Sequence, residues 1–85
     1  MKLTIIGVGL IGGSIALKLR EKGFVDYVYG VDQNEQHLAE AKELEIIDES
    51  SSLENAVQNS DLIILAIPVD AARKLLPTVL DLVNH

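Results

Sequence analysis

The sequence predicts an α/β fold, in which helices flank a parallel sheet of strand order 3-2-1-4. Short apolar segments alternate with longer segments whose apolar positions recur three or four residues apart. Strands that alternate with helices in this way form parallel sheets with right-handed crossovers. The most apolar segments also lack polar alternation, as expected for strands that are covered on both faces.

Length and composition limit the chain to one small domain. Its 85 residues are 48% hydrophobic and 24% charged, enough for a modest buried core. The formal charge of −6 would repel nucleic acid and anionic membranes, so neither is an expected partner. The chain has no cysteine, which fits a reducing compartment, and its first apolar run is too short for a signal peptide. We therefore expect a cytoplasmic protein.

The first two elements are a strand and a helix. Residues 3–6 are apolar or β-branched throughout, which predicts a buried strand. A helix is expected from Leu10 to Lys22, with Gly23 as its stop signal. The apolar positions of this helix recur four residues apart, at Ile11, Ile15 and Leu19.

The second pair of elements repeats this order. Residues 27–31 predict a strand, and Asn34 can cap a helix that runs to about Leu44. The residues of this helix that we expect to face inward are Leu38 and Ala41. Ile46 and Ile47 are expected to form a short third strand.

A third helix and a fourth strand follow. Ser51 and Glu54 have the spacing of a capping box, which predicts a helix through Val57. Residues 62–67 form the most apolar run and predict a buried strand. In the order 3-2-1-4 this strand lies at an open edge, so we expect more sheet to follow His85.

The last predicted element is a helix after Pro68. Asp70 could cap it. Pro77 is expected either to break this helix or to begin another, because an interior proline removes a hydrogen-bond donor and clashes with the preceding turn.

A glycine-rich turn joins the first strand to the first helix. Gly7, Gly9 and Gly12 fit the pattern GxGxxG. Gly7 would permit the tight turn, Gly9 would let the backbone approach a pyrophosphate, and Gly12 would let the helix pack close to the sheet. The helix N-terminus would then offer unpaired N–H groups to the phosphates. A purely structural turn, or a site for another nucleotide such as an adenosylated methyl donor, remains the alternative.

An acidic residue stands where such folds bind the adenosine ribose. Asp32 ends the second strand, and its carboxylate could accept hydrogen bonds from the ribose hydroxyls. It would repel a 2′-phosphate, and neither Gln33 nor Asn34 is a cation that could offset this repulsion. The sequence therefore predicts a Rossmann-type fold that binds NAD rather than NADP. The structural alternative is that Asp32 is a turn or capping residue.

The end of the fourth strand completes the predicted site. Its backbone could line the nicotinamide half of the site, although Pro68 could equally well just terminate the strand. The predicted cofactor-binding residues are Gly7, Val8, Gly9, Leu10, Ile11, Gly12, Asp32, Gln33, Ala66, Ile67 and Pro68. We predict no catalytic residue and no metal site in this chain, and we expect His37 to be a solvated surface residue.

The segments GVGLIGGSIALKL, VDQN, EIIDES and SDLIILAIPVD together resemble the prephenate dehydrogenases, NAD-dependent enzymes of tyrosine biosynthesis. The resemblance extends over essentially the whole chain, and the first segment is much more specific than GxGxxG alone. One departure is Glu45, where this family commonly has glycine. This difference affects a loop and leaves the cofactor prediction intact.

The resemblance implies oxidative decarboxylation of prephenate to 4-hydroxyphenylpyruvate with NAD. Residues 1–85 would be the N-terminal part of the dinucleotide-binding domain. The catalytic and substrate-binding residues, and a helical domain that forms a homodimer, would lie in later segments, so this part alone is expected to be inactive. The alternatives are another NAD-dependent dehydrogenase, acting on hydroxy acids or imines, and a non-catalytic module that senses NAD or NADH.

Overall fold

The computed structural model describes residues 1–83, in which strands and helices alternate as the sequence predicts. The elements are β1 (Lys2–Ile6), α1 (Leu10–Glu21), β2 (Tyr27–Val31), α2 (Glu35–Glu43), β3 (Glu49–Ser50), α3 (Leu53–Asn59), β4 (Leu62–Leu65) and α4 (Val69–Val83). His85, beyond which we expect more sheet, lies outside the described residues.

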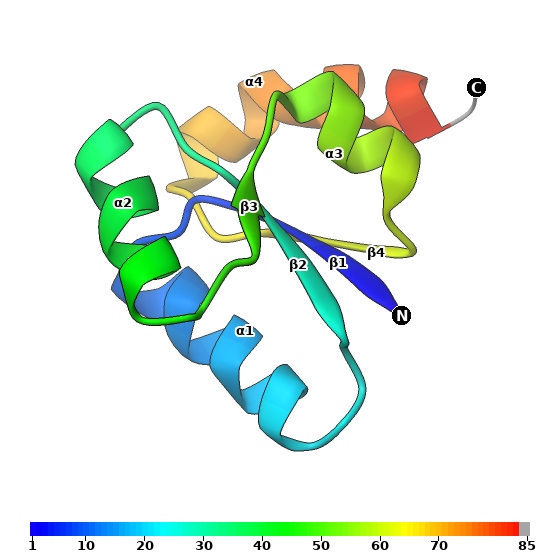
Figure 1. Cartoon of the computed structure of the whole chain (residues 1–85). Helices are drawn as coiled ribbons and strands as arrows, with labels where there is room; N and C mark the ends of the chain where they lie inside the picture. Colours follow the sequence, from blue (N-terminus) through cyan, green and yellow to red (C-terminus); the bar gives the residue numbers. More distant parts are fainter. Residues whose placement is uncertain (84–85) are drawn as a thin grey trace.

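The four strands form one parallel sheet in the order β3-β2-β1-β4, which confirms the predicted topology. β1 is central, and its Leu3 stands in register with Val28 of β2 and Leu62 of β4. Because the strands run in one direction, their carboxyl ends meet at one edge of the sheet (Figure 1). The strand order reverses beside β1, and ligands of open α/β sheets bind at such a point.

Helices cover both faces of the sheet. α1 and α2 lie on one face, and α3 and α4 lie on the other (Figure 1). The larger core lies between the sheet and the pair α1 and α2. Its buried residues are Leu3, Ile5, Val8, Ala16, Val25, Val28, Ala41 and Ile47. On the opposite face, Val79 of α4 and the α3 residues Ala56 and Val57 are buried.

α1 contacts the sheet through small residues. Its buried face consists of Gly12, Gly13 and Ala16. The predicted apolar stripe does not form the contact, because Ile11 is 72% exposed and Ile15 is 37% exposed, although Leu19 packs against the core. The reason is the close approach at Gly12, where a Cβ atom would lie 2.1 Å from the carbonyl oxygen of Gly7. At Gly12 the helix therefore lies too near the sheet for a larger side chain to fit between them.

α2 begins with the predicted cap. The side-chain oxygen of Asn34 accepts hydrogen bonds from the backbone N–H groups of Gln36, at 2.9 Å, and His37, at 3.2 Å. Ala41 is buried and Leu38 packs against the core, so the predicted inward face of this helix is confirmed.

The third strand lies later in the chain than Ile46 and Ile47, where we expected it. β3 pairs with Tyr29 and Gly30 of β2. Ile47 is 2% exposed and belongs to the core, and the partly buried Ile46 packs against it. Backbone pairing with β2 begins only at Asp48, whose N–H group donates to the carbonyl of Val28 at 2.9 Å. The apolar pair is therefore used for packing, while the polar residues after it form the strand.

α3 begins one residue later than the predicted capping box and extends past Val57 to Asn59. Its N-cap is Ser52, whose hydroxyl accepts a hydrogen bond from the N–H group of Asn55 at 3.2 Å. Ser51 is not the cap, because its own N–H group donates to the carbonyl of Gly30 and continues the sheet pairing.

α4 is continuous through Pro77, contrary to the prediction of a break. It begins directly after Pro68, whose carbonyl accepts a hydrogen bond from the N–H group of Ala72, so Asp70 lies in the first turn rather than at the cap. Val79, beyond the proline, is 4% exposed. Packing against α3 thus holds the helix past a residue that would end an isolated one.

β4 ends at Leu65, two residues earlier than predicted, and lies at the edge of the sheet. All four of its residues are partly exposed. The N–H group of Ala66 still donates to the carbonyl of Ile6 at 2.8 Å, so the chain leaves the sheet just after this bond. Further strands beyond residue 85 stay a prediction.

α1 and α2 end in the same hydrogen-bonded cap. A residue with positive φ follows each helix, Gly23 at 78° and Glu45 at 61°. In both caps, two N–H groups donate to carbonyls of the last turn at 2.8 to 3.1 Å. Glycine adopts this left-handed conformation freely, whereas a residue with a β-carbon is disfavoured by about 1–2 kcal/mol. Glu45 stands where the family that this chain resembles commonly has glycine, and it is therefore a strained position.

We predict that Glu45→Gly raises the free energy of unfolding by about 0.5–1 kcal/mol, because it relieves the left-handed strain at a smaller cost in chain entropy. Urea denaturation at pH 7 measures this. Glu45→Gln, which removes the charge and keeps the β-carbon, is the control and should change stability little. A Glu45→Gly protein no more stable than Glu45→Gln would contradict the strain.

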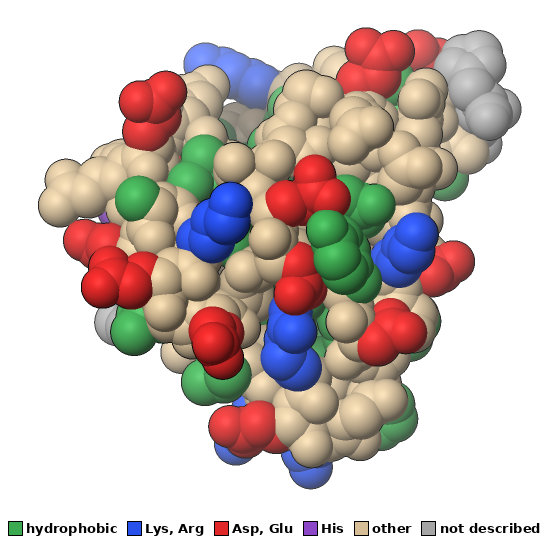
Figure 2. All heavy atoms as spheres, in the orientation of Figure 1, with side chains coloured by type: hydrophobic (Ala, Val, Ile, Leu, Met, Phe, Trp, Pro, Cys, Tyr) green, Lys and Arg blue, Asp and Glu red, His purple; other side chains and the backbone are tan. Residues whose placement is uncertain are grey.

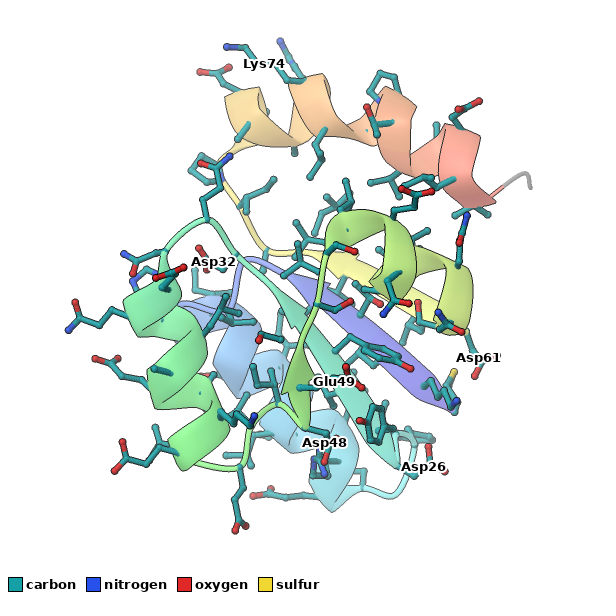
Figure 3. The ribbon with its side chains drawn as sticks, turned by 45° about the horizontal axis from the view of Figure 1, so that its top comes forward. Asp26, Asp32, Asp48, Glu49, Asp61 and Lys74 are labelled. Carbon is teal, nitrogen blue, oxygen red and sulfur yellow. The ribbon has the colours of Figure 1, made fainter. Side chains whose placement is uncertain are left out.

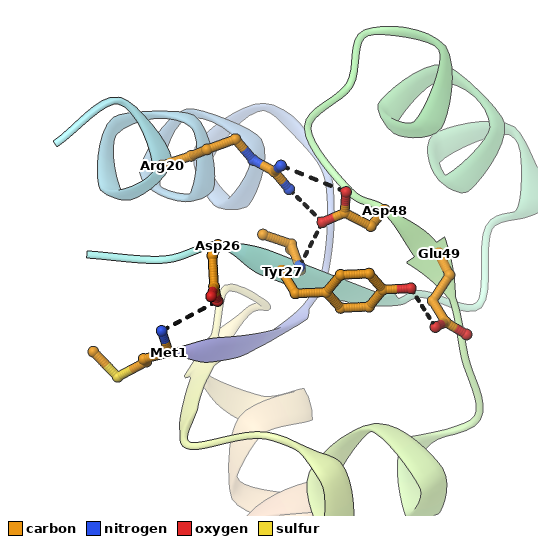
Figure 4. Close-up of polar contacts among 7 residues, drawn as sticks. Met1, Arg20, Asp26, Tyr27, Asp48 and Glu49 are labelled. Atoms are coloured by element: carbon orange, nitrogen blue, oxygen red, sulfur yellow. Dashed lines mark hydrogen bonds and ion pairs between the residues drawn. The ribbon is translucent and has the colours of Figure 1, made fainter. Parts of the chain in front are cut away.

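An ion pair ties the end of α1 to the sheet (Figure 4). Nη2 of Arg20 lies 2.5 Å from Oδ2 of Asp48, which also accepts the N–H group of Val28 at 2.7 Å. Partial burial raises the pKa of Asp48, but the hydrogen bonds from Arg20 and Val28 and the Arg20 charge outweigh this, so the pKa lies below its ordinary value. The ionised form of Asp48 is thus favoured by folding.

We predict that Asp48→Asn lowers the free energy of unfolding by about 1–3 kcal/mol at pH 7, because a charged hydrogen bond is lost. A lowered pKa stabilises the fold above the pKa of the unfolded chain, and this stabilisation is lost as pH falls through the folded value. The difference from wild type should therefore narrow between pH 5 and pH 2, as measured by urea denaturation. Asp26→Asn removes one carboxylate from an exposed ion pair with the N-terminus, so it is the control for the effect of net charge alone on stability. A constant difference at all pH values would contradict the assignment.

Candidate functional site

The turn between β1 and α1 requires glycine at Gly7. Its φ of 94° is a conformation that other residues rarely adopt. A Cβ atom here would lie 2.5 Å from the carbonyl oxygen of Ala66 and 2.6 Å from Cγ2 of Ile67. The Gly7 N–H group donates to the carbonyl of Val31 at 2.7 Å. The turn is therefore held between the carboxyl ends of β2 and β4.

The other two glycines of the pattern differ from each other in their surroundings. A Cβ atom at Gly12 would lie 2.1 Å from the carbonyl oxygen of Gly7 and 3.0 Å from Cβ of Ala66, so the helix approaches the sheet as closely as glycine allows. A Cβ atom at Gly9 would meet nothing within 4 Å. The backbone at Gly9 is thus open to an approaching group.

The N-terminus of α1 faces this open side of the turn. Gly9 is the N-cap and has no side chain that could accept from the first-turn N–H groups, and this turn contains no acidic residue. Leu10 is the first residue of the helix, and Ile11 follows it with a largely exposed side chain. Unpaired N–H groups and the positive end of the helix dipole can hold an anion here without lysine or arginine.

Asp32 lies directly after β2, beside the glycine turn. Its Oδ2 accepts a hydrogen bond from the N–H group of Val8 at 3.0 Å, and its Oδ1 accepts one from Asn34 at 2.8 Å. Burial raises the pKa of Asp32, but these donors and the nearby His37 outweigh it, so the pKa lies below its ordinary value. The carboxylate is ionised at neutral pH and retains acceptor capacity for hydroxyl groups. It is both a turn residue, as in the structural alternative, and an available ligand.

A groove of about 700 Å³ opens at the carboxyl edge of the sheet, on the side of α4. This volume lies within the usual range for ligand pockets. The predicted residues that line it are Gly7, Asp32, Gln33, Ile67 and Pro68. Apolar side chains form much of the remaining wall, namely Ile6, Val31, Leu53 and Leu75. The groove thus combines an apolar interior with a carboxylate at its rim.

The remaining predicted residues lie beside this groove. Val8, Gly9, Leu10, Ile11 and Gly12 belong to the turn and the start of α1, and Ala66 lies against the turn at Gly7. The cofactor role of these residues stays a prediction, while the open turn, the close helix packing and the position of Asp32 are observed geometry.

Sequence reasoning missed the part of the groove contributed by α3 and α4. Ser51 and Ser52 line it from the connection before α3, and Ala71 and Lys74 line it from α4. Lys74 lies at the same end of the sheet as Asp32 (Figure 3). It is a single lysine on an amphipathic helix and belongs to no motif, so only the packing of α4 reveals its place.

Other site classes find little support in residues 1–83. No cluster of three or more histidine, cysteine or acidic residues suited to a metal ion occurs within this range. No helix in the same range is long and apolar enough to cross a membrane. Acidic and basic side chains are interspersed over the face shown in Figure 2.

A protein-family comparison identifies the chain independently of this geometry. The family model described as "Prephenate dehydrogenase, nucleotide-binding domain" matches residues 15–85. The match starts within α1, so it does not depend on the glycine turn. It agrees with the resemblance carried by the sequence segments.

Individual relatives support the same family. The chain is 38% identical to the prephenate dehydrogenase of Lactococcus lactis subsp. cremoris over 88% of its own length and 21% of that enzyme. It is 36% identical to the A. aeolicus prephenate dehydrogenase solved with hydroxyphenyl propionate and NAD⁺, with a TM-score of 0.78 over 88% of this chain and 27% of that one. It is 34% identical to Synechocystis arogenate dehydrogenase, with a TM-score of 0.76 over 100% of this chain and 29% of that one.

The chain therefore spans between a fifth and a third of the length of these relatives. Within that length, the parallel sheet of order 3-2-1-4 corresponds to part of an NAD-binding domain. Because the family model matches residues 15–85, most of the chain, the chain belongs to the prephenate dehydrogenase family, as a part of its nucleotide-binding domain.

Proposed function

We propose that this chain is the NAD-binding part of a prephenate dehydrogenase. The observation that carries the proposal is the open glycine turn at Gly9 beside the ionised Asp32, in a chain of this family. The full protein would oxidise the ring hydroxyl of prephenate, with loss of carbon dioxide, to 4-hydroxyphenylpyruvate. NAD would serve as the hydride acceptor.

The residues present fit a dinucleotide in one orientation. The pyrophosphate would lie over Gly9 against the first-turn N–H groups of α1, where nothing fills the space above the backbone. The adenosine ribose would bind the carboxylate of Asp32 through its hydroxyls. The adenine would enter the apolar groove between Val31 and Ile67, and the nicotinamide would extend past Ala66 toward the open edge at β4.

The charge at Asp32 favours NAD over NADP. Its lowered pKa keeps the carboxylate ionised, and the two neighbouring residues Gln33 and Asn34 are neutral. An ionised carboxylate that binds the ribose hydroxyls would repel a phosphate at the 2′ position. The same charge attracts the hydroxyl donors of an unsubstituted ribose, so one residue accounts for both binding and discrimination.

The whole protein would need groups that this chain does not supply. The groups that bind prephenate and assist at its hydroxyl would come from other segments, and a helical domain in those segments would form a homodimer. We also place the protein in the cytoplasm. The contribution of the present residues would be to orient the cofactor so that its reactive face meets the substrate.

We predict that Asp32→Asn weakens NAD binding about 10–100-fold, because the ribose loses a charged acceptor worth about 1.5–3 kcal/mol. NADP binding should weaken less, since the repulsion of its 2′-phosphate is removed as well. Calorimetry with both cofactors measures this. Asp61→Asn makes the same chemical change at the opposite end of the sheet and is the control. Equal loss for NAD and NADP would remove Asp32 from the proposed role.

We predict that the full gene product forms NADH when it is supplied with NAD and prephenate, as measured by absorbance. Arogenate and NADP are the parallel controls. Residues 1–85 alone should bind NAD and form no NADH, because the substrate-binding groups are proposed to lie elsewhere. Turnover by these residues alone would contradict that division. Binding of NAD by the full product without reduction by either substrate would favour a sensing module or another dehydrogenase.

A further inference from the structure

His37 lies against the carboxylate that is proposed to bind the ribose. Its Nδ1 is 3.4 Å from Oδ2 of Asp32, and its side chain is 45% exposed. The residue stands in the first turn of α2, where its backbone N–H group donates to the Asn34 cap. The sequence predicts a solvated surface histidine at this position. The structure shows that this exposed side chain also contacts Asp32.

His37 also lines a second groove, of about 320 Å³, between α1 and α2. Val8 and Gly9 of the glycine turn line the same groove, so the imidazole and the proposed pyrophosphate site share one space. Two carboxylates lie near His37: Asp32, after β2, contacts the imidazole, and Glu40, one turn further along α2, lines the same groove. α1 contributes Gly13, Ser14 and Leu17, which carry no charge.

We propose that His37 is a specificity-determining residue whose protonation lets this site accept a ribose that carries a 2′-phosphate. The inference rests on the proposed dinucleotide site. With a neutral imidazole, Asp32 repels a 2′-phosphate and the site selects NAD. With an imidazolium, the positive charge offsets that carboxylate, and NADP becomes a competing ligand.

The chemistry of imidazole suits this role. Histidine is the side chain whose charge ordinarily changes between pH 5 and pH 8. In the imidazolium form both ring nitrogens donate hydrogen bonds. Nδ1 faces Asp32, which leaves the Nε2–H group for a phosphate oxygen. Among the described residues that line this groove, His37 is the one side chain able to carry a positive charge.

The test is equilibrium binding of NAD and NADP to the intact protein at pH 5.5 and pH 8.5, with circular dichroism to confirm folding at each pH. The readout is the ratio of the two dissociation constants, which cancels changes common to both cofactors. In the wild type, the preference for NAD over NADP should be about tenfold smaller at pH 5.5, as expected for one added charge contact.

Three variants test whether the pH dependence of this ratio comes from His37 or from another group. His37→Gln should lose most of the pH dependence, and whatever remains reports titration of the 2′-phosphate itself. His37→Arg carries a fixed charge and should shift the ratio toward NADP about tenfold at pH 8.5. Lys42→Gln removes a positive charge near the other end of α2 and should keep the wild-type pH dependence.

The outcomes distinguish this inference from the proposed function. If NAD binds and depends on Asp32, but His37→Gln retains the full pH dependence of the ratio, the role of His37 is overturned while the cofactor site stands. A His37→Arg protein that does not shift toward NADP at pH 8.5 would overturn it equally. If neither cofactor binds at either pH, the proposed cofactor site is overturned, and this inference with it.

Discussion

The close contact between α1 and the sheet at Gly12 is the constraint on which the rest of this structure depends. A Cβ atom there would lie 2.1 Å from the carbonyl oxygen of Gly7 in the turn and 3.2 Å from Cγ2 of Ile5 in β1, so a larger residue would push the helix away. The contact brings the N-terminus of α1 to the carboxyl ends of β1 and β4. In the first turns of α1 the small residues Gly12, Gly13 and Ala16 are buried, while Ile11 and Ile15 are exposed; Leu19, further along the helix, packs against the core.

Asp32 holds the local fold together, and the same carboxylate is the one proposed to bind the ribose. The hydrogen bond from Val8 ties the residue to the glycine turn, and the hydrogen bond from Asn34 shapes the start of α2. These donors also favour the ionised form, which is the form that a ribose hydroxyl requires. The hydrogen bonds that position the side chain therefore also favour its ionised form. The structural and functional interpretations of this residue are complementary.

The chain carries a formal charge of −6 and yet has a site suited to an anion. Oriented backbone explains this, because the N–H groups at the start of α1 act over a short distance and carry no net charge. The distant carboxylates are screened by salt at such separations. Lys74 lies at the margin of one groove and His37 at the margin of the other, where each side chain can contact one end of a ligand.

The sequence by itself determined the features that depend on neighbouring residues. The alternation of strands and helices, the Asn34 cap and the positions of Gly7, Gly12 and Asp32 follow from local periodicity and turn chemistry, and the strand order was expected because such alternation is typical of doubly wound α/β folds. Only the tertiary structure decided which face of α1 is buried, where β3 begins, that α4 continues through Pro77, and that Lys74 and His37 border the grooves. These features depend on packing between segments that are distant in the chain. Such packing overrides the local preference of a segment where a distant segment limits the available space or provides a hydrogen-bond partner.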